Sequence, residues 1–269
     1  NACNWLYMHW SNDYYASRNN CYLGDEMRYK CIVSYDGTCF HGFQVQPNLR
    51  TVQEEIEKVL QIICKKKITI FPSGRTDTGV HAIGQVFHFD TEIDMGEWNM
   101  KNAINSRLPR DIYIKEVSKV SLDFHARFSS KRKEYHYIIG LDEYNPLRKN
   151  YVYYPPFKNF DIDKMKDASS IFVGEHDFKS FTKNHKIENT VRTIYSINFE
   201  KTEDILIIKF IGNGFLHNMV RILVAMLFMV GIGKLSKDDL KSILDKKNRV
   251  YAPKIAPSNG LYLYEVKYE

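Results

Sequence analysis

Residues 73–89 read SGRTDTGVHAIGQVFHF, a charged turn that runs directly into a strand-like segment. Asp77 lies between two threonines, with Arg75 before it and Gly79 after it. The two-residue periodicity of residues 85–89 predicts a β-strand. An isolated Asp-Thr-Gly is most simply a turn whose carboxylate is capped by neighbouring hydroxyls. A catalytic interpretation of Asp77 therefore needs support from the rest of the chain.

Three familiar kinds of carboxylate or metal chemistry fit the sequence poorly. An aspartic protease needs two facing Asp-Thr-Gly loops that share one proton, whereas this chain has one copy and an adjacent arginine that favours ionisation. A glycosidase needs a second carboxylate in comparable surroundings, and none is evident. The nine histidines lack ligand-like spacing, and Walker or dinucleotide phosphate loops are absent. The sequence therefore predicts neither a metal site nor a cofactor.

Length and composition indicate a globular protein with a modest basic excess. A chain of 269 residues can bury a core in one or two domains, and 44% hydrophobic with 26% charged residues is ordinary. A net charge of +6 favours a polyanionic partner such as nucleic acid, although a lysine-rich solvated surface gives the same value. The longest apolar run, residues 222–230, is too short to cross a bilayer. We therefore expect no association with membranes.

The cysteines do not follow the pattern of a disulfide framework or a zinc knuckle. Their number is odd, no two have Cys-x-x-Cys spacing, and none follows residue 64. Such thiols suit a reducing compartment, so we expect a cytoplasmic protein. The five are Cys3, Cys21, Cys31, Cys39 and Cys64.

Residues 1–26 differ in composition from the rest of the chain. They are rich in Asn and Tyr, show no clear period, and carry one arginine against three acids, a net charge of −2. Met27 then opens the strand-like segment RYKCIVSY. We interpret Met27 as the natural start and residues 1–26 as upstream or added sequence outside the core. A genuine N-terminal extension is the alternative.

Residues 27–140 are expected to form a first α+β half that carries the Asp77 loop. Thr51 begins a capping box, and apolar residues then recur at helical spacing. Pro109 ends a second helical pattern. The expected strands are residues 28–35, 68–71, 85–89, 112–120 and 134–140, and the expected helices are 52–63 and 98–108.

Residues 141–269 repeat a similar order and are expected to form a second α+β half. The segment 217–231 is apolar nearly all round, which indicates a buried helix. The expected strands are residues 191–200, 205–211 and 261–268, and further helices are expected at 162–172 and after Ser236. Together the two halves predict an α+β fold with antiparallel sheets.

The longer pattern around Asp77 resembles the TruA family of bacterial tRNA pseudouridine synthases. Supporting stretches occur in family order from Met27 to the C-terminus without a large gap, whereas residues 1–26 have no counterpart. The resemblance implies the pseudouridine synthase fold, with two similar halves flanking a central active-site cleft. The supporting stretches are VSYDGTCFHGFQVQPNLRTVQEEIEKVL, DFHARFSSKRKEYHYIIG, GEHDFKSF, VRTIY, GNGFLHNMVRILV and GLYLYEVKY.

This resemblance implies an isomerase that acts on tRNA. The family converts uridine to pseudouridine in the anticodon stem-loop, at roughly positions 38–40, on a target base that must leave its stack. The reaction is redox-neutral and transfers no group, so it needs neither nicotinamide nor metal. The resemblance also implies a homodimer that receives tRNA in a cleft. A noncatalytic RNA-binding protein of the same fold is the alternative.

Three residues match the site of the family, and Arg75 is a further candidate beside them. Asp77 matches the nucleophile, a role that suits an ionised carboxylate. Tyr135 matches a tyrosine that supports the flipped base and handles a proton, although a core strand tyrosine is the plain alternative. Arg221, a costly charge on an apolar helix, matches the partner of Asp77, unless it snorkels from a helix end. Arg75 is a candidate phosphate contact or an ordinary surface arginine.

Basic clusters supply further candidates for contact with tRNA. Lysines and arginines gather at residues 65–67, 131–133 and 183–186. Each cluster can bind phosphate, and each can equally be a solvated face.

Overall fold

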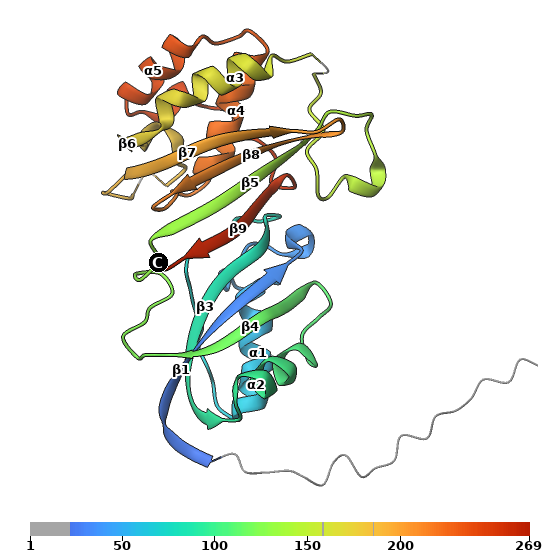
Figure 1. Ribbon diagram of the computed structural model, residues 1–269, viewed down its shortest axis with the longest axis vertical. Helices are drawn as coiled ribbons and strands as arrows, with labels where there is room; N and C mark the ends of the chain where they lie inside the picture. Colours follow the sequence, from blue (N-terminus) through green and yellow to red (C-terminus); the bar gives the residue numbers. More distant parts are fainter. Residues whose placement is uncertain (1–21, 158, 185) are drawn as a thin grey trace, which may run out of the picture.

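The computed structural model describes residues 22–157, 159–184 and 186–269. Its strands form one sheet in the order β4-β1-β3-β9-β5-β8-β7-β6, with β2 paired to β3 (Figure 1). The strands are β1 (Tyr22–Tyr35), β2 (Phe71–Pro72), β3 (His81–Asp94), β4 (Ile112–Val120), β5 (Arg132–Gly140), β6 (Gly174–Asp177), β7 (Val191–Lys201), β8 (Ile205–Gly212) and β9 (Leu261–Lys267). The helices are α1 (Val52–Cys64), α2 (Glu97–Asn105), α3 (Ile162–Ser169), α4 (Met219–Gly231) and α5 (Lys237–Asp245). The expected α+β class is confirmed.

In the first half, α1 and α2 cover an antiparallel set made of β4, β1 and β3. Helix α1 buries Val52, Ile56 and Leu60, which lie on one face because an α-helix turns every 3.6 residues. Thr51 caps the helix by accepting a hydrogen bond from the backbone N–H of Glu54. The reciprocal half of the predicted capping box is replaced by a salt bridge from Glu54 to Lys58.

In the second half, α3, α4 and α5 cover β5, β8, β7 and β6. Helix α4 is buried on nearly all sides, as its sequence predicts. Leu223 at its centre is fully buried, and truncating such a leucine to alanine costs about 2–5 kcal/mol. Strand β5, which the sequence grouped with the first half, pairs with β8 and β9. Its hydrogen bonds therefore place it in the sheet of the second half.

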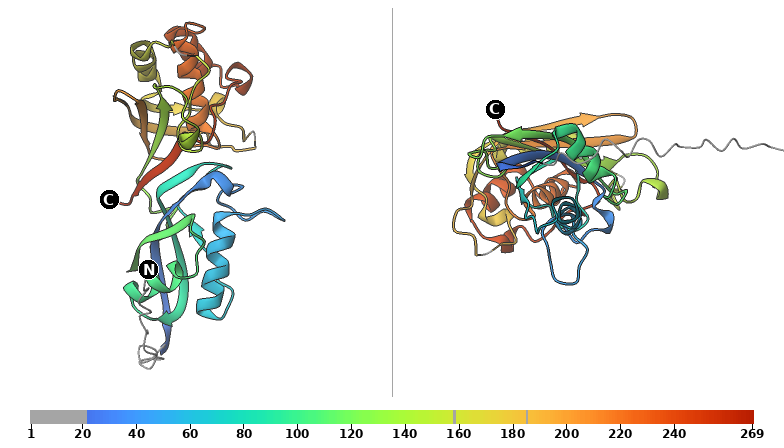
Figure 2. Two further views of the ribbon diagram at one scale, coloured as in Figure 1. Left: turned by 90° about the vertical axis from the view of Figure 1, so that its right-hand side faces the viewer. Right: turned by 90° about the horizontal axis from the view of Figure 1, so that it is seen from below.

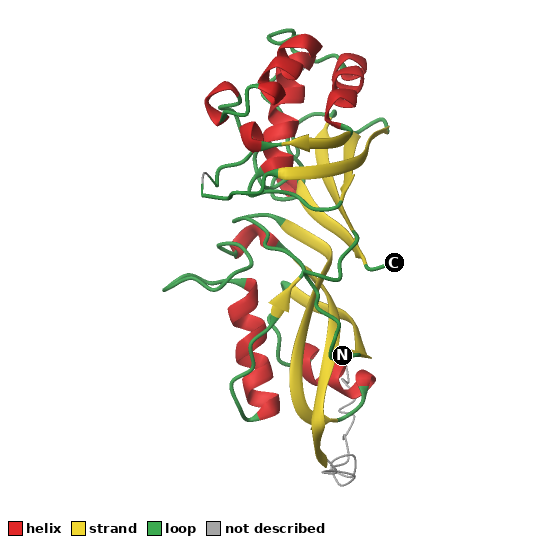
Figure 3. Ribbon diagram, turned by 90° about the vertical axis from the view of Figure 1, so that its left-hand side faces the viewer, coloured by secondary structure: helices red, strands yellow, loops and turns green. Residues whose placement is uncertain are grey.

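Strand β9 joins the two halves into one sheet. It pairs antiparallel with β5 and, through Tyr262 and Leu263, parallel with the start of β3. The expectation of two antiparallel sheets thus holds within each half, and the junction between them is parallel. Figures 2 and 3 show α1 and the helices of the second half on the same face of this sheet.

Several element boundaries differ from those predicted by sequence periodicity. Strand β1 begins at Tyr22, before Met27, because its early residues pair with the end of β3. Residues 1–21 lie outside the described residues, so the interpretation of that segment stays a prediction. Residues 68–70 do not extend β2: the Ile70 N–H donates to the Glu57 carboxylate of α1, so this backbone is satisfied by a side chain instead of a strand.

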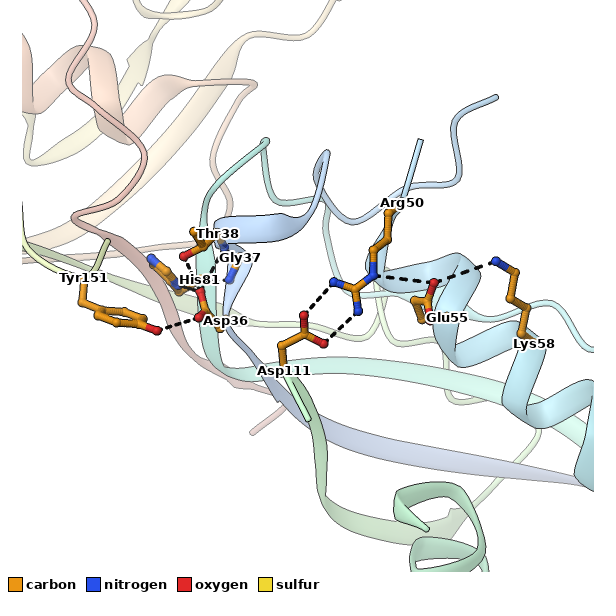
Figure 4. A network of polar contacts seen from close by, with 9 residues as sticks. All are labelled: Asp36, Gly37, Thr38, Arg50, Glu55, Lys58, His81, Asp111 and Tyr151. Atoms are coloured by element: carbon orange, nitrogen blue, oxygen red, sulfur yellow. Dashed lines mark hydrogen bonds and ion pairs between the residues drawn. The ribbon is translucent and has the colours of Figure 1, made fainter. Parts of the chain in front are cut away.

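A polar network fixes the start of β3 and ties it to the segment after β5 (Figure 4). The His81 imidazole Nδ1 accepts a hydrogen bond from the Gly37 N–H at 3.0 Å, and its Nε2 donates to the Asn150 carbonyl at 2.8 Å. Burial lowers the pKa of His81, so the ring is neutral. Its contact with Asp36 is therefore not an ion pair; the Tyr151 hydroxyl donates to that carboxylate instead.

Candidate active site

Asp77 lies on the loop between β2 and β3, and neighbouring segments hold this loop in place. The Phe43 N–H donates to the Thr76 carbonyl at 3.1 Å, and the Val80 N–H donates to the Asp77 carbonyl at 3.1 Å. The hydroxyls of Tyr35 and Thr76 share a hydrogen bond of 2.7 Å. The backbone on both sides of the carboxylate is thus fixed without using the carboxylate itself.

The beginning of the loop is fixed by buried polar contacts. The Ser73 hydroxyl donates to the Gln85 side-chain oxygen at 2.7 Å, and the Gln85 amide donates to the Gly74 carbonyl at 2.8 Å. The Lys133 ammonium donates to the Ser73 carbonyl at 2.5 Å. Gln85, on β3, and Lys133, on β5, therefore connect the loop to both halves of the sheet.

Gly42 allows a second backbone segment to approach the loop closely. Its φ of +86° lies in the left-handed region that favours glycine. A Cβ at this position would lie 2.9 Å from the Thr76 carbonyl oxygen. A side chain at position 42 would therefore push on the backbone next to Asp77.

Two cationic or ionisable side chains from the start of α4 face the Asp77 carboxylate. One Arg221 guanidinium nitrogen lies 3.6 Å from Oδ2, and His217 Nε2 lies 3.5 Å from Oδ1. Both distances exceed those of good hydrogen bonds, so the carboxylate oxygens stay open to a substrate group. The Asp77 side chain keeps 21% of its surface exposed. The pairing of Asp77 with Arg221 expected from the sequence is present in the structure.

The position of Arg221 is itself held by two other groups. Its Nε donates to the Ala256 carbonyl at 2.8 Å, and Nη1 donates to the Asn218 side-chain oxygen at 2.9 Å. Asn218 precedes α4 with a φ of +61°, a conformation that asparagine tolerates better than most residues. Arg221 does not snorkel to solvent; it is directed toward the Asp77 loop and is 15% exposed.

Tyr135 is buried on β5 near the same loop. Its ring packs edge-to-face against Phe215, with centroids 5.2 Å apart. Burial raises the pKa of its phenol, and nearby Tyr35 and Asp77 raise that pKa further. The phenol is therefore protonated at neutral pH and can donate a hydrogen bond. Tyr135 is a buried strand residue and a neighbour of the Asp77 loop at the same time.

The other basic candidates separate into surface and interior groups. Arg75 is exposed, and the hydrogen bonds and ion pairs of the described residues do not include its guanidinium. Lys131 is exposed, whereas Lys133 is directed inward to Ser73. Burial, followed by repulsion from Arg127 and Arg192, lowers the pKa of Lys133 to about 8. Lys133 thus supports the loop. The sequence alone groups it with Lys131 and Arg132 as a cluster on the surface.

The described ranges contain no group of three or more His, Cys, Asp or Glu side chains arranged to hold a metal ion. Within the same ranges, no helix is both long and apolar enough to cross a bilayer.

Comparison with known proteins gives the family. A family model described as tRNA pseudouridine synthase matches residues 31–129 and 168–269. The chain belongs to the tRNA pseudouridine synthase family. It is similar to tRNA pseudouridine synthase A 1 of Bacillus cereus, with 49% identity over 90% of this chain and 98% of that protein. It is 48% identical to tRNA pseudouridine synthase A of Listeria innocua, over 90% of this chain and 99% of that protein.

Membership of this family makes the chain an isomerase that forms pseudouridine in tRNA, and it confirms the resemblance to the TruA family. Asp77 and Arg221 lie in the two matched segments, and Tyr135 lies between them. Among solved structures, the archaeal box H/ACA sRNP Nop10–Cbf5 complex shows 12% identity over 86% of this chain and 59% of that chain, with a TM-score of 0.31. That distant likeness adds nothing to the family match.

Sequence reasoning missed several residues that the structure brings to this site. They do not stand out because hydroxyl, amide and ammonium groups occur throughout a soluble chain, and only folding brings them to the loop. The one usable signal was the stretch GNGFLHNMVRILV, which holds His217 and Asn218 beside Arg221. The missed residues are Tyr35, Gly42, Ser73, Thr76, Gln85, Phe215, His217, Asn218 and Ala256.

Proposed function

We propose that Asp77 is the nucleophile of this enzyme and that its target uridines lie in the tRNA anticodon stem-loop, at roughly positions 38–40. The observation that carries the first part is the placement of Asp77 on a fixed loop with its carboxylate oxygens open and Arg221 at 3.6 Å. A structural aspartate would be expected to accept hydrogen bonds from its own turn.

In this proposal the reaction needs few protein groups. The glycosidic bond from C1′ to N1 breaks, the uracil turns, and a bond from C1′ to C5 forms. C5 loses a proton and N1 gains one, so no atom enters or leaves. Asp77 holds the substrate covalently while the bond is exchanged. Arg221, 3.6 Å from Oδ2, keeps the carboxylate oriented and offers it a compensating positive charge. Tyr135 supports the flipped base, and its protonated phenol can donate a hydrogen bond to it.

The nucleophile is tested by Asp77→Asn. Unmodified tRNA transcripts are treated with each enzyme, labelled with carbodiimide, and read as stops in reverse transcription. We expect no pseudouridine from the variant, while its affinity for tRNA stays within about a factor of ten, because the carboxylate contributes to chemistry and not to affinity. Asp204→Asn, an exposed aspartate on the turn between β7 and β8, is the matched control. Normal turnover by Asp77→Asn would overturn the assignment.

The same assay tests the target positions. A transcript with cytidine in place of the uridines at roughly positions 38–40 offers the same fold without the proposed targets. We expect labelling of the parent transcript and none of the substituted one. Pseudouridine at other uridines of the substituted transcript would contradict the proposed positions and leave the assignment of Asp77 intact.

We also propose that the enzyme is a homodimer in the cytoplasm. Large side chains are exposed on two strands: Tyr113 on β4 is 52% exposed and Tyr195 on β7 is 50% exposed, although Ile112, Ile114 and Ile194 beside them are buried. In this proposal a second copy of the chain covers these exposed rings. We expect light scattering to give the mass of a dimer and Tyr113→Arg to shift it toward a monomer. A monomeric wild-type enzyme would contradict this part. The free thiols of Cys31, Cys39 and Cys64 fit a reducing compartment.

A further inference from the structure

A group of residues that this reaction scheme does not use lies beside the start of the Asp77 loop. We call it the flanking patch. It combines three aromatic rings with three cations from β2, β5, β7 and the turn before β5. Its members are Phe71, His125, Phe128, Arg127, Lys133 and Arg192.

The aromatic members form a continuous chain of ring contacts that ends at the surface. The rings of Phe71 and His125 are 6.0 Å apart, and those of His125 and Phe128 are 4.3 Å apart between centroids. Phe71 is 43% exposed and Phe128 is 76% exposed. The buried His88 ring packs against the Phe71 ring, with centroids 5.1 Å apart, and fixes the inner end of this chain of rings. Most of the Phe128 ring therefore faces solvent.

The turn that carries Phe128 is held in one conformation. His125 Nδ1 accepts hydrogen bonds from the Arg127 and Phe128 N–H groups at 3.1 and 3.4 Å. The Ser129 N–H donates to the His125 carbonyl at 2.9 Å. Because the backbone is already ordered, presenting this ring to a ligand costs little conformational entropy. An exposed phenylalanine on an ordered turn is an available stacking surface.

The cationic members connect this turn to the Asp77 loop. Lys133 donates to the Ser73 carbonyl, and a Cβ on Gly74 would lie 3.2 Å from its ammonium. Burial and then the charges of Arg127 and Arg192 lower the pKa of Lys133, and the ion pairs of the described residues include none of these three cations. Like charges brought together without a carboxylate repel one another, and a polyanion would relieve that repulsion.

We propose that the flanking patch binds the single-stranded part of the tRNA next to the target uridine, with an unpaired base stacked on Phe128 and phosphates contacting Arg127 and Arg192. Arg192 donates to the Asn189 and Val191 carbonyls, and the ion pairs of the described residues include neither Arg192 nor Arg127. Aromatic rings next to such arginines match single-stranded RNA, whose bases stack and whose phosphates attract cations. The inference rests on the proposed function, because it extends the tRNA site outward from the Asp77 loop.

The stacking part is tested by tRNA binding in the Asp77→Asn background, measured by fluorescence anisotropy with an unmodified transcript. Phe128→Ala should weaken binding about 5- to 100-fold, the effect of losing one stacked base. Phe128→Trp should bind like its parent, because it keeps a stacking face. Trp98→Ala on α2 is the control, since that ring is 75% exposed and lies outside the patch. It should leave the affinity unchanged.

The phosphate part is tested by the salt dependence of the same binding. Arg127→Gln and Arg192→Gln should each reduce the slope of log affinity against log salt by about 0.7 to 0.9, the value for one phosphate contact. Lys241→Gln on α5, an exposed lysine paired with Asp245, should leave the slope unchanged. Unchanged slopes in both arginine variants would overturn the phosphate contacts.

The outcomes distinguish failure of the patch from failure of the proposed function. The enzyme with Asp77 intact is assayed by carbodiimide labelling on the same transcripts. Absence of labelling there would count against the function itself. Labelling together with a Phe128→Ala affinity within twofold of the parent would overturn the patch alone. The patch would also be overturned if Phe128→Ala turned a dimer into a monomer with unchanged affinity, because Phe128 would then serve contact between copies.

Discussion

At the scale of single residues, the site consists of a carboxylate whose own turn leaves its oxygens free. Asp77 is fixed through its backbone and faces Arg221 and His217 across distances longer than a hydrogen bond. Arg221 is in turn fixed by Asn218 and Ala256. A charge that is positioned before the substrate arrives can stabilise the reaction without reorganising during it.

Arg221→Met should reduce catalysis far more than affinity for tRNA. Methionine keeps the length and apolar packing of this helix position, so the fold should survive, while Asp77 loses the positive charge that faces and orients it. We expect turnover at saturating tRNA to fall at least about 100-fold, the scale of removing one preorganised electrostatic group, with the dissociation constant nearly unchanged. Lys131→Ala, at an exposed lysine, should show the reverse pattern. Normal saturated turnover with weakened binding would make Arg221 a phosphate contact.

Gly42→Ala should impair turnover more than the strain of its backbone angle explains. The new Cβ would lie 2.9 Å from the Thr76 carbonyl, next to Asp77. Gly96→Ala is the matched control, because Gly96 has a φ of +76° and no heavy atom within 4 Å of a Cβ. Each variant should lose about 1 kcal/mol of stability from its left-handed backbone angle. Only Gly42→Ala should lose activity in the labelling assay; equal activities would show that the loop tolerates the contact.

At the scale of elements, β3 supports the turn between β4 and β5 through a buried histidine. His88 Nδ1 accepts a hydrogen bond from the Ala126 N–H at 3.1 Å. Burial, together with the nearby charges of Arg28 and His125 and against the opposing charge of Asp90, lowers the pKa of His88 to about 4. The ring is therefore neutral at pH 7, which leaves Nδ1 free to accept.

This shift predicts a loss of stability in mild acid. The folded pKa of His88, about 4, lies below the usual value of 6.5 that applies on unfolding, so protonation favours the unfolded chain. The stability present above pH 6.5 is lost as the pH falls toward 4. Between pH 7.5 and 5 we expect His88 to account for a loss on the order of 1–2 kcal/mol. The side-chain oxygen of Asn can replace Nδ1 as acceptor. In urea unfolding, the free energy of unfolding of His88→Asn should therefore fall by that much less between pH 7.5 and 5 than that of the wild-type enzyme.

His176→Asn serves as the control for that comparison, because His176 lies at the edge of the second half and contacts only the Val173 carbonyl through its ring nitrogen. It should keep the acid sensitivity of the wild-type enzyme. Equal sensitivity in His88→Asn would mean that other groups cause the acid effect.

At the scale of the whole molecule, one continuous sheet carries the groups of the site from both halves. Asp77 comes from the first half, Arg221 and His217 from the second, and β9 joins the two through a short parallel step. A change in the relative position of the halves would separate the carboxylate from its cation. In the proposed mechanism, catalysis therefore depends on the β3–β9 junction.

Chelators should leave the activity of the complete enzyme unchanged. The reaction exchanges one bond for another without oxidation, and the described part of the chain offers no cluster of metal ligands. Phenanthroline is the suitable reagent because it spares the Mg²⁺ of folded tRNA. The measurement is carbodiimide labelling before and after treatment. Loss of labelling that is restored by added Zn²⁺ would show that a metal takes part.

The sequence by itself determined the local structure and the position of the carboxylate. Periodicity predicted most helices and strands, since each depends on residues a few positions apart, and the Ser236 cap formed as predicted. The stretch around Asp77 indicated the family, and the resemblance named Tyr135 and Arg221. Boundaries such as residues 68–70 were wrong, because a side chain of α1 took the backbone hydrogen bond there.

Only the tertiary structure decided which distant groups meet. The inward direction of Lys133, the close approach of Gly42 to Thr76, and the parallel pairing of β3 with β9 all join segments far apart in the chain. A lysine next to two other basic residues has the same local pattern whether it faces water or a carbonyl group. Its direction depends on packing and on buried hydrogen bonds that exist only after the two halves have come together.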